Sequence, residues 1–372
     1  MRQSPLLFTI IAILIFGVVG VTRCAPKPLL TTSPITSPAS PERFLSSPLL
    51  KPIQDDGEFI LFISFRDRSP NIYAISPDGA KEYPVLALPS SVRVTGQLDW
   101  TAANKNKRLI AFSLVQGVRS DVFVADLATS NLYNITGQTP SGGIEPRWSP
   151  DGTRLVYVCG DYEPDICIIG IDGGGYAQLT SHPSRDINPS WSPDGLAIAY
   201  QTSRSGLSDI YLLELENLKE RNLTQGKSQN AQPSWSPDGK LILFQSDRDG
   251  SMDIFVISTD GTYIRNLTSS KALDVDPKWS PDGELIAFRS NRDGSWDLFV
   301  MKRDGRELRN LTYGRGPVFT YAWSPDSRYI AFASGYGGNS DIFKVDIKSG
   351  EIIQLTKHPA EDMAPLWIFQ RD

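Results

Sequence analysis

Residues that can pair through charge recur in this sequence at fixed distances from a repeated glycine and a repeated tryptophan. Nine residues after the glycine of a D-G turn stand four arginines: Arg66, Arg204, Arg248 and Arg292. Five residues before a tryptophan, in the same four repeats, stand Asp362, Asp186, Asn230 and Asp274, and the other three repeats lack both members. This joint occurrence predicts that each arginine donates a charge-assisted hydrogen bond to its partner and joins two loops on one rim. A ring of free carboxylates that binds a metal or a cationic peptide is disfavoured, because the arginines neutralise it.

The last repeat departs most from this pattern and supplies a second set of candidate binding residues. Its entry loop and hairpin contain Tyr313, Arg315, Phe319, Tyr321 and Tyr336. Exposed aromatic rings beside an arginine are suited to stacking on a sugar or to anchoring a peptide. The structural alternative, which we favour, is that these rings fill the space left by the missing arginine–carboxylate pair.

Catalytic and metal-binding chemistry has little support. The only histidines, His182 and His358, occupy the same place in two repeats that lie four repeats apart. Zinc ligation and a Ser-His-Asp relay need residues that converge, and the sequence has neither a G-x-S-x-G motif nor a phosphate-binding glycine loop. We therefore expect no catalytic residue, no metal and no cofactor. The net charge of −5 argues against nucleic acid as a partner.

Two further polar patterns follow the repeat. An aspartate opens the third apolar run of six repeats, at Asp121, Asp165, Asp209, Asp253, Asp297 and Asp341. Its spacing does not fit the D-x-D-x-D-G loop of a calcium site, so we expect it to bond the backbone of its own hairpin. Four N-x-T sequences, at Asn134, Asn222, Asn266 and Asn310, fall at one repeat position. They indicate a strand-edge pattern rather than glycan sites.

Two cysteines flank a hairpin in the third repeat. Cys159 and Cys167 stand on its second and third apolar runs. They form a disulfide in an oxidising compartment or pack as small buried side chains, and the sequence leaves both alternatives open.

A repeat of about 44 residues must position all these groups. Seven tryptophans, from Trp100 to Trp367, follow one another at gaps of 48, 43, 44, 44, 44 and 44 residues, and five begin a W-S-P-D sequence. In the unit from Gln232 to Thr268, four short apolar or alternating runs are separated by Pro, Asp and Gly turn signals. This pattern predicts four antiparallel strands per repeat, as in the blades of a β-propeller.

The repeated W-S-P-D-G, with the I-A-F, D-I-F and N-L-T runs that follow it, resembles the TolB-type propeller repeat from Gly57 to Phe369. The resemblance implies an all-β fold and work at the cell envelope with a lipoprotein partner. TolB itself has an α/β domain before its propeller, and here we expect a tether in that place. Some propellers with similar repeats are lyases of acidic polysaccharides that use several histidines and a metal, a content that this chain does not match.

Closure of the ring determines the number of blades. The segment Ala364 to Phe369 is a tryptophan strand with no hairpin behind it, and Phe59 to Ser64 begins a repeat that has no tryptophan strand in front. We expect the C-terminal strand to complete the first blade, which gives seven blades. A rival first strand at Lys51 to Gly57 offers Ile53 in place of tryptophan and ranks lower.

The N-terminal residues form two further segments. Residues 1–24 contain the apolar run Leu6 to Val21 and then Cys24, which predicts an uncleaved membrane anchor or a lipid-modified cysteine. Residues 25–56 contain seven prolines and predict an extended linker, and residues 57–369 the propeller. We expect the propeller outside the cytoplasm, although an anchor with the propeller inside remains as an alternative.

These patterns favour a membrane-anchored, extracytoplasmic propeller that acts as a non-enzymatic binding or scaffold module. Its expected partner is an envelope protein or peptide, or a glycan. The competing hypotheses are an enzyme that acts on a glycan or a peptide, and a carbohydrate-binding propeller.

Overall fold

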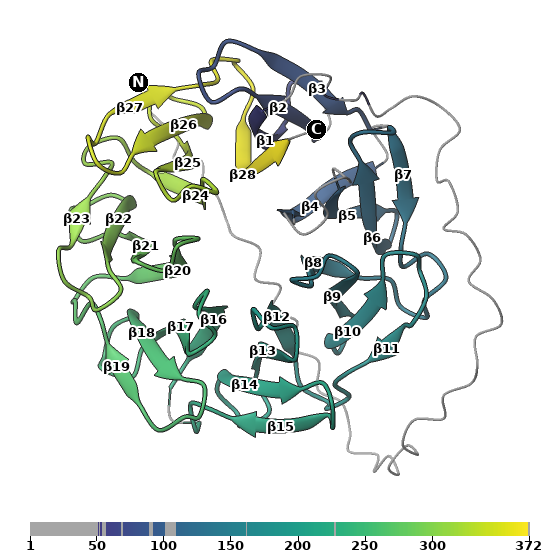
Figure 1. Ribbon diagram of the computed structural model, residues 1–372. Coiled ribbons are helices and arrows are strands. Elements are labelled where there is room, and N and C mark those ends of the chain that lie inside the picture. Colours follow the sequence, from purple (N-terminus) through teal and green to yellow (C-terminus); the bar gives the residue numbers. More distant parts are fainter. Residues whose placement is uncertain are drawn as a thin grey trace, which may run out of the picture. The chain divides into compact units, whose positions relative to one another are not determined.

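The computed structural model describes residues 51, 53, 57–67, 70–88, 92–100, 109–160, 162–226 and 228–370. In this part of the chain the strands pair into seven antiparallel four-stranded sheets, which stand around a central axis as the blades of a propeller (Figure 1). The second strand of a blade is largely buried, as in Leu241–Ser246, because a neighbouring blade packs on each of its faces. The predicted all-β, seven-bladed fold is confirmed.

The blades are numbered along the chain, and their strands are given from the axis outward. Blade one contains β28 (Asp362–Gln370), β1 (Gly57–Ser64), β2 (Asn71–Ile75) and β3 (Glu82–Leu86); blade two contains β4 (Val92–Trp100), β5 (Leu109–Gln116), β6 (Arg119–Asp126) and β7 (Asn131–Asn134). Blade three contains β8 (Ile144–Trp148), β9 (Arg154–Cys159), β10 (Asp165–Gly170) and β11 (Ala177–Gln178); blade four contains β12 (Asp186–Trp191), β13 (Ala197–Thr202), β14 (Asp209–Glu214) and β15 (Lys219–Asn222). Blade five contains β16 (Asn230–Trp235), β17 (Leu241–Ser246), β18 (Asp253–Ser258) and β19 (Ile264–Asn266); blade six contains β20 (Asp274–Trp279), β21 (Leu285–Ser290), β22 (Asp297–Lys302) and β23 (Arg309–Asn310). Blade seven contains β24 (Val318–Trp323), β25 (Tyr329–Ser334), β26 (Asp341–Asp346) and β27 (Ile352–Gln354).

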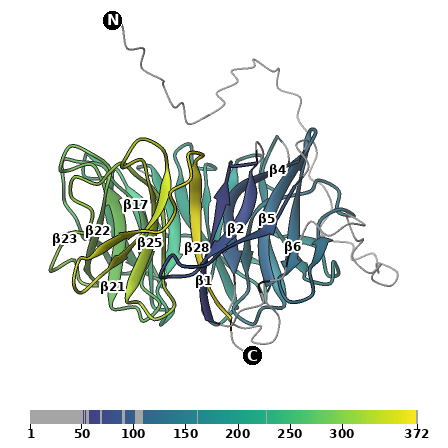
Figure 2. The ribbon, with the colours of Figure 1, turned by 90° about the horizontal axis from the view of Figure 1, so that it is seen from above.

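The two ends of the propeller meet in blade one. Strand β28 pairs antiparallel with β1, with Trp367 opposite Ile60, and both views show the two strands side by side (Figures 1 and 2). The predicted closure by the C-terminal strand is therefore confirmed. The innermost place in blade one is taken by β28 rather than by the rival strand, and the Lys51 amide donates to the carbonyl of Val85 on β3, at the other edge of the blade.

The predicted anchor, residues 1–24, and Cys24 lie outside the described residues, as does the predicted linker, residues 25–56, except for Lys51 and Ile53. Ile53 is buried and belongs to the core cluster between blades one and two. Ile53, which belongs to the predicted linker, is thus packed in the propeller core. Among the described residues, no helix has the length and hydropathy needed to cross a membrane.

Four of the repeated tryptophans, Trp148, Trp191, Trp279 and Trp323, hydrogen-bond the blade before them. The indole N–H of Trp191 donates to the carbonyl of Arg147 at 3.0 Å, and that of Trp279 donates to the carbonyl of Ser234 at 3.2 Å. The acceptor is the residue that precedes the tryptophan of the preceding blade. Because this acceptor is a backbone carbonyl, the contact holds whatever side chain that residue carries.

The aspartate that opens the third strand clamps the fourth strand. In blade five, Asp253 accepts hydrogen bonds from the Asn266 side chain at 3.0 Å and from the Thr268 hydroxyl at 3.0 Å, while the Ile254 amide donates to the Thr268 hydroxyl. The same aspartate–threonine bond occurs in blades two to seven. The expectation that this aspartate bonds its own hairpin is therefore wrong, because its main partners lie on the next strand. The four sequon asparagines, Asn134, Asn222, Asn266 and Asn310, all donate to it.

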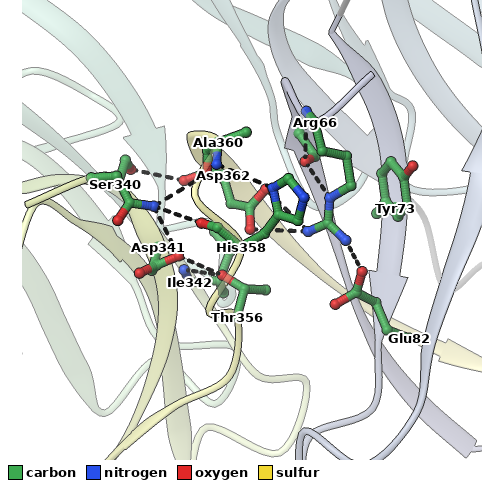
Figure 3. Close-up of polar contacts among 12 residues, drawn as sticks. Arg66, Tyr73, Glu82, Ser340, Asp341, Ile342, Thr356, His358, Ala360 and Asp362 are labelled. Atoms are coloured by element: carbon green, nitrogen blue, oxygen red, sulfur yellow. Dashed lines mark hydrogen bonds and ion pairs between the residues drawn. The ribbon is translucent and has the colours of Figure 1, made fainter. Parts of the chain in front are cut away.

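The four arginines lie beside the partners expected from the sequence. Their Nη2 atoms donate to Asp362 at 3.1 Å, Asp186 at 2.9 Å, Asn230 at 2.8 Å and Asp274 at 2.7 Å, from Arg66, Arg204, Arg248 and Arg292 respectively. Figure 3 shows Arg66 between Asp362, Glu82 and the ring of Tyr73. The backbone amide of Asp362 donates in turn to the carbonyl of Ser340, in the hairpin of blade seven. Each of these pairs thus links the hairpins of two adjacent blades on one rim, which we call the hairpin rim.

Blades three and seven fill the arginine position differently. In blade five, Arg248 lies over the Phe244 and Phe255 rings and donates to Ser246. In blade three the positions of Ser246 and Phe255 are taken by Cys159 and Cys167, which form a disulfide. In blade seven, the Tyr336 ring packs edge-on against Phe343, with centroids 6.4 Å apart. Tyr336 therefore occupies the space of the missing arginine, as the structural alternative proposed.

Closure makes a testable contribution to stability. Trp367 is 2% exposed and stacks on Tyr329 of blade seven, so Trp367→Ala should lower the free energy of unfolding by about 3–5 kcal/mol. Trp296→Ala, which removes a partly exposed tryptophan outside the repeat series, is the matched control. Denaturant titration of both variants measures the difference, and an equal or smaller loss for Trp367→Ala would contradict the proposed importance of closure.

The rim pairs can be tested by a double-mutant cycle. Asp274 is fully buried, so Arg292→Ala leaves its carboxylate without the arginine and should cost about 3–5 kcal/mol of unfolding free energy. Combining it with Asp274→Ala should cost about 1–3 kcal/mol less than the sum of the single changes. The cycle of Arg248→Ala and Asn230→Ala, whose acceptor is a neutral amide, should give a smaller coupling energy. Strict additivity of the first cycle would refute the pairing.

Candidate functional site: the central channel and the blade-seven surface

The innermost strands of all seven blades enclose a cavity of about 330 Å³ on the propeller axis. One position lines it in every blade: the residue immediately before the repeated tryptophan, which is Asp99, Arg147, Ser190, Ser234, Lys278, Ala322 and Leu366 in blades two to seven and one. The residue two places before the tryptophan lines it in six blades, and four of these residues are prolines.

A β-bulge turns these side chains towards the axis. In five blades the residue three places before the tryptophan has a positive φ, between 52° and 56°: Glu145, Asn188, Gln232, Asp276 and Ala364. The register of the pairing shifts beside each of them, for example between Val275 and Lys278 of β20. A bulge inserts one unpaired residue and re-aims the side chains next to it. Lys278 and its counterparts therefore face the cavity although they stand beside a buried tryptophan.

Charge is distributed unevenly around the cavity. Asp99 and Arg147 line it from blades two and three, and Asp276 and Lys278 line it from blade six. In contrast, Ser190 and Ser234 give blades four and five a neutral polar wall. This asymmetry distinguishes the channel from the repeated scaffold, in which most blades carry the same residue at a given position.

Each charged group of the channel has a defined environment. The Arg289 Nε donates to Asp276 at 2.7 Å, which forms an ion pair at the wall, and the backbone amide of Trp148 donates to Asp99 at 2.8 Å. Burial raises the pKa of Asp99, and the neighbouring Arg147 partly offsets this rise. Burial also lowers the pKa of Lys278 to about 8, against the opposing effect of Asp276. Titratable groups with shifted pKa values in a cavity mark a candidate functional site.

The second candidate area lies on the hairpin rim of blade seven, and we call Tyr313, Arg315, Phe319 and Tyr336 the blade-seven surface. Tyr313 is 75% exposed, while Phe319 and Tyr336 are 43% and 45% exposed. The Arg315 guanidinium lies 5.6 Å from the centre of the Tyr336 ring. Phe319 also lines the central cavity, so the blade-seven surface continues into the mouth of the channel.

The remaining residues that the sequence singled out are Tyr321, His182 and His358, and each makes hydrogen bonds to groups of the protein itself. Tyr321, expected on the exposed surface, is 2% exposed, and its hydroxyl donates to the carbonyl of Ala287 at 2.8 Å. The expectation of an exposed ring is therefore wrong for this residue. His182 and His358 are exposed and make local hydrogen bonds, with the Ser184 hydroxyl and the Ala360 amide respectively. In the part of the chain that the structure describes, no group of three or more His, Cys, Asp or Glu is arranged to hold a metal ion.

Asp99, Arg147 and Lys278 are absent from the site residues expected from the sequence. The signal that marks them is the position immediately before each repeated tryptophan, where three repeats have a charged residue and four do not. This position lines the channel because of the bulge in the innermost strand. The regular alternation of side chains along a strand does not predict such a bulge. In a regular strand, neighbouring side chains point to opposite faces of the sheet. The residue next to a buried tryptophan would then point into the space on the other side of its blade, and not towards the axis.

Solved structures share the fold of this chain at low sequence identity. TolB from Acinetobacter baumannii is 18% identical, with 86% of this chain and 81% of that protein covered and a TM-score of 0.54. Oligogalacturonate lyase from Vibrio parahaemolyticus is 12% identical, with coverage of 83% and 87% and a TM-score of 0.61. A puromycin-hydrolyzing peptidase of Mycobacterium tuberculosis is 16% identical, with coverage of 83% and 53% and a TM-score of 0.66, so this chain spans about half of its length.

The sequence comparisons give the family. No curated protein is significantly similar to this chain in sequence. The family model of the TolB beta propeller domain matches residues 100–246, 201–262 and 227–320, which together extend from the end of β4 in blade two into β24 of blade seven and cover more than half of the chain. With the W-S-P-D-G repeat and the seven closed blades, this match shows that the chain belongs to the TolB beta propeller domain family.

Proposed function

We propose that this protein is a non-enzymatic binding module that holds a peptide segment of a second envelope protein against the blade-seven surface. The observation that carries this proposal is the gathering of three exposed aromatic rings and one arginine on one rim of one blade. Aromatic residues and arginine dominate the energetics of protein interfaces, because they bury a large area and also offer polar contacts. The corresponding positions of four other blades hold the rim pairs instead.

The arrangement of the blade-seven surface suits an extended segment. Tyr313 stands in the entry loop, Tyr336 in the hairpin, and Phe319 at the mouth of the channel. The loop and the hairpin are held together, because the Gly335 amide donates to the carbonyl of Pro317 and the Ser334 hydroxyl donates to the carbonyl of Arg315. Such a surface is preorganised, which lowers the entropic cost of binding. The exposed Arg315 favours a segment that carries a carboxylate.

We further propose that the propeller works outside the cytoplasm, held at the membrane by residues 1–24. The disulfide between Cys159 and Cys167 supports this location, since disulfides persist in oxidising compartments and are rare in the cytosol. The apolar run Leu6 to Val21 and Cys24 support the anchor from the sequence. Residues 25–56, rich in proline, would then act as the spacer.

A second candidate function is catalysis on a glycan or a peptide inside the channel. The observation that favours it is the pair of opposite pKa shifts, upward for Asp99 and downward for Lys278, within one cavity. Two fold neighbours are named as an oligogalacturonate lyase and a puromycin-hydrolyzing peptidase. Release of product from oligogalacturonate or a peptide, abolished by Lys278→Met, would replace the binding proposal.

The binding surface can be mapped by site-specific photo-crosslinking in cells. A photoreactive phenylalanine analogue in place of Tyr313 should capture one envelope protein, because this side chain is 75% exposed at the proposed contact. The same analogue in place of Tyr162, a tyrosine of blade three that is 96% exposed, is the matched control. Adding Arg315→Glu should lower the yield at the first position at least about tenfold, if this arginine is a hot-spot residue. Equal capture at both positions, or none at the first, would reject the proposal.

The location can be tested by the redox state of the cysteines. Both cysteines are buried, so the cells are lysed directly in denaturant that contains the alkylating agent, and Cys159 and Cys167 should stay unmodified because both sulfurs are in the disulfide. A chain that lacks residues 1–24 and is made in the cytoplasm is the control and should be alkylated at both positions. Reduction should also lower the unfolding free energy by about 2–3 kcal/mol, as expected for so short a loop. Free thiols in the full-length protein would contradict an extracytoplasmic location.

A further inference from the structure

Lys278 is a cation held inside the channel without a carboxylate of its own. Its Nζ donates to the carbonyl of Tyr321 at 2.8 Å and lies 4.7 Å from the centre of the Tyr321 ring. No carboxylate among the described residues lies within ion-pair distance of it. An ammonium has three N–H donors, and the backbone contact uses one. The side chain keeps part of its surface exposed, and that surface belongs to the cavity wall.

The other charges around the channel do not neutralise Lys278. Asp276 on β20 is engaged by the guanidinium of Arg289 on β21. Asp99 on β4 lines the opposite part of the cavity beside Arg147 on β8, whose charge opposes protonation of both Asp99 and Lys278. Asp276 and Asp99 favour the ammonium form of Lys278, whereas Arg147 and Arg289 oppose it. Lys278 itself lies in the cavity wall with no carboxylate of the described residues within ion-pair distance, and a counter-ion beside such a partly buried charge is bound more strongly than in water.

The remaining walls define what kind of anion fits. Blades seven and one supply apolar surface through Phe319, Ala322, Pro365 and Leu366. Blades four and five supply amide and hydroxyl groups, among them Asn188 and Gln232. A cavity of about 330 Å³ is of the size that holds a small organic molecule. The walls thus match a molecule with one anionic end and an apolar body.

We propose that the central channel binds a small organic carboxylate, whose anionic end accepts hydrogen bonds from the Lys278 ammonium beside Arg147 and whose apolar body lies against blades seven and one. This site shares Phe319 with the blade-seven surface, but it depends on Lys278, so its test is independent of the peptide contact proposed there. The carboxylate accepts charge-assisted hydrogen bonds from the ammonium donors that the backbone contact leaves unused.

Phenylacetate is a suitable probe, because it combines a carboxylate with a compact apolar ring. Calorimetry or ligand-observed NMR with the full-length protein should give saturable binding with a Kd of about 1 mM at pH 7, as expected for so small a ligand. Phenylacetamide, which has the same shape without the charge, should bind at least about tenfold more weakly. Equal binding of the two compounds, or no binding of phenylacetate up to about 20 mM, would overturn the proposal.

The chain offers a matched pair of lysines for the mutational test. Lys344 resembles Lys278, since its Nζ donates to a backbone carbonyl, that of Pro77, and lies 4.8 Å from the centre of the Tyr329 ring, yet it does not line the cavity. Lys278→Met should weaken phenylacetate binding at least about tenfold, the effect of one charge-assisted contact, whereas Lys344→Met should leave it unchanged. Equal effects of the two changes would contradict a site at Lys278.

Binding to the unmodified protein should depend on pH in a defined direction. The ammonium form of Lys278 binds the anion, and its pKa near 8 means that this form is lost as the pH rises. The Kd should therefore increase on the order of tenfold between pH 7 and pH 9, while phenylacetate itself stays ionised. Asp99, Asp276, Arg147 and Arg289 are the other charged groups that act on Lys278, and none of them is expected to reverse this trend. A Kd that is constant over this range would overturn the role of Lys278.

The same carboxylate chemistry occurs at the C-terminus of a peptide, so a second ligand pair distinguishes the source. Acetyl-Ala-Ala-Phe as the free acid is compared with its C-terminal amide under the same conditions. Tighter binding of the tripeptide acid than of phenylacetate assigns the site to a chain end. Binding of phenylacetate alone assigns it to a free organic acid. Failure of both acids overturns the proposal.

Discussion

The pairing of β28 with β1 is the contact on which the rest of this structure depends. A single blade exposes two apolar faces, and only a neighbour on each side can bury both of them. An open array would leave the outer face of blade one and that of blade seven in water. By placing Trp367 between Ile60 and Tyr329, the C-terminal strand buries these two faces in one step. Closure also creates the central channel, because the cavity exists only when all seven inner strands surround it.

The residues that recur in the repeats form the scaffold, whereas the positions that differ between the blades form the candidate site. The residues that recur, such as the W-S-P-D turn, the clamp between Asp253 and Thr268, and the pair of Arg292 with Asp274, make contacts within a blade or between adjacent blades. Their recurrence made the architecture predictable, because each copy solves the same packing problem. The channel residues solve no such problem. Asp99, Arg147 and Lys278 occupy equivalent positions with different chemistry, and this difference gives the channel its charge.

The sequence therefore predicts the fold far better than it predicts the site. Period, turn residues and the unpaired C-terminal strand were sufficient for seven closed blades, and the joint occurrence of Arg66 with Asp362 placed two residues together that lie 296 positions apart. Two features required coordinates. The bulge at Asp276 depends on a left-handed backbone conformation that no glycine announces, and the burial of Tyr321 depends on how β24 packs against blade six. Both concern the direction of a side chain, which the alternation of a strand does not determine once its register has shifted.

The tryptophan contacts have a consequence for how such a molecule diversifies. The indole N–H of Trp191 binds the main-chain oxygen of Arg147, and that of Trp323 binds the main-chain oxygen of Lys278, so these two bonds make no demand on the side chains of Arg147 and Lys278. Four positions on the axis accept such a bond through their main chain, those of Asp99, Arg147, Ser234 and Lys278, and the bond itself does not fix their side chains. Substitutions at these positions can exchange acidic, basic, hydroxyl and apolar side chains. The ligand preference of the channel can then change while the indole bonds between the blades persist.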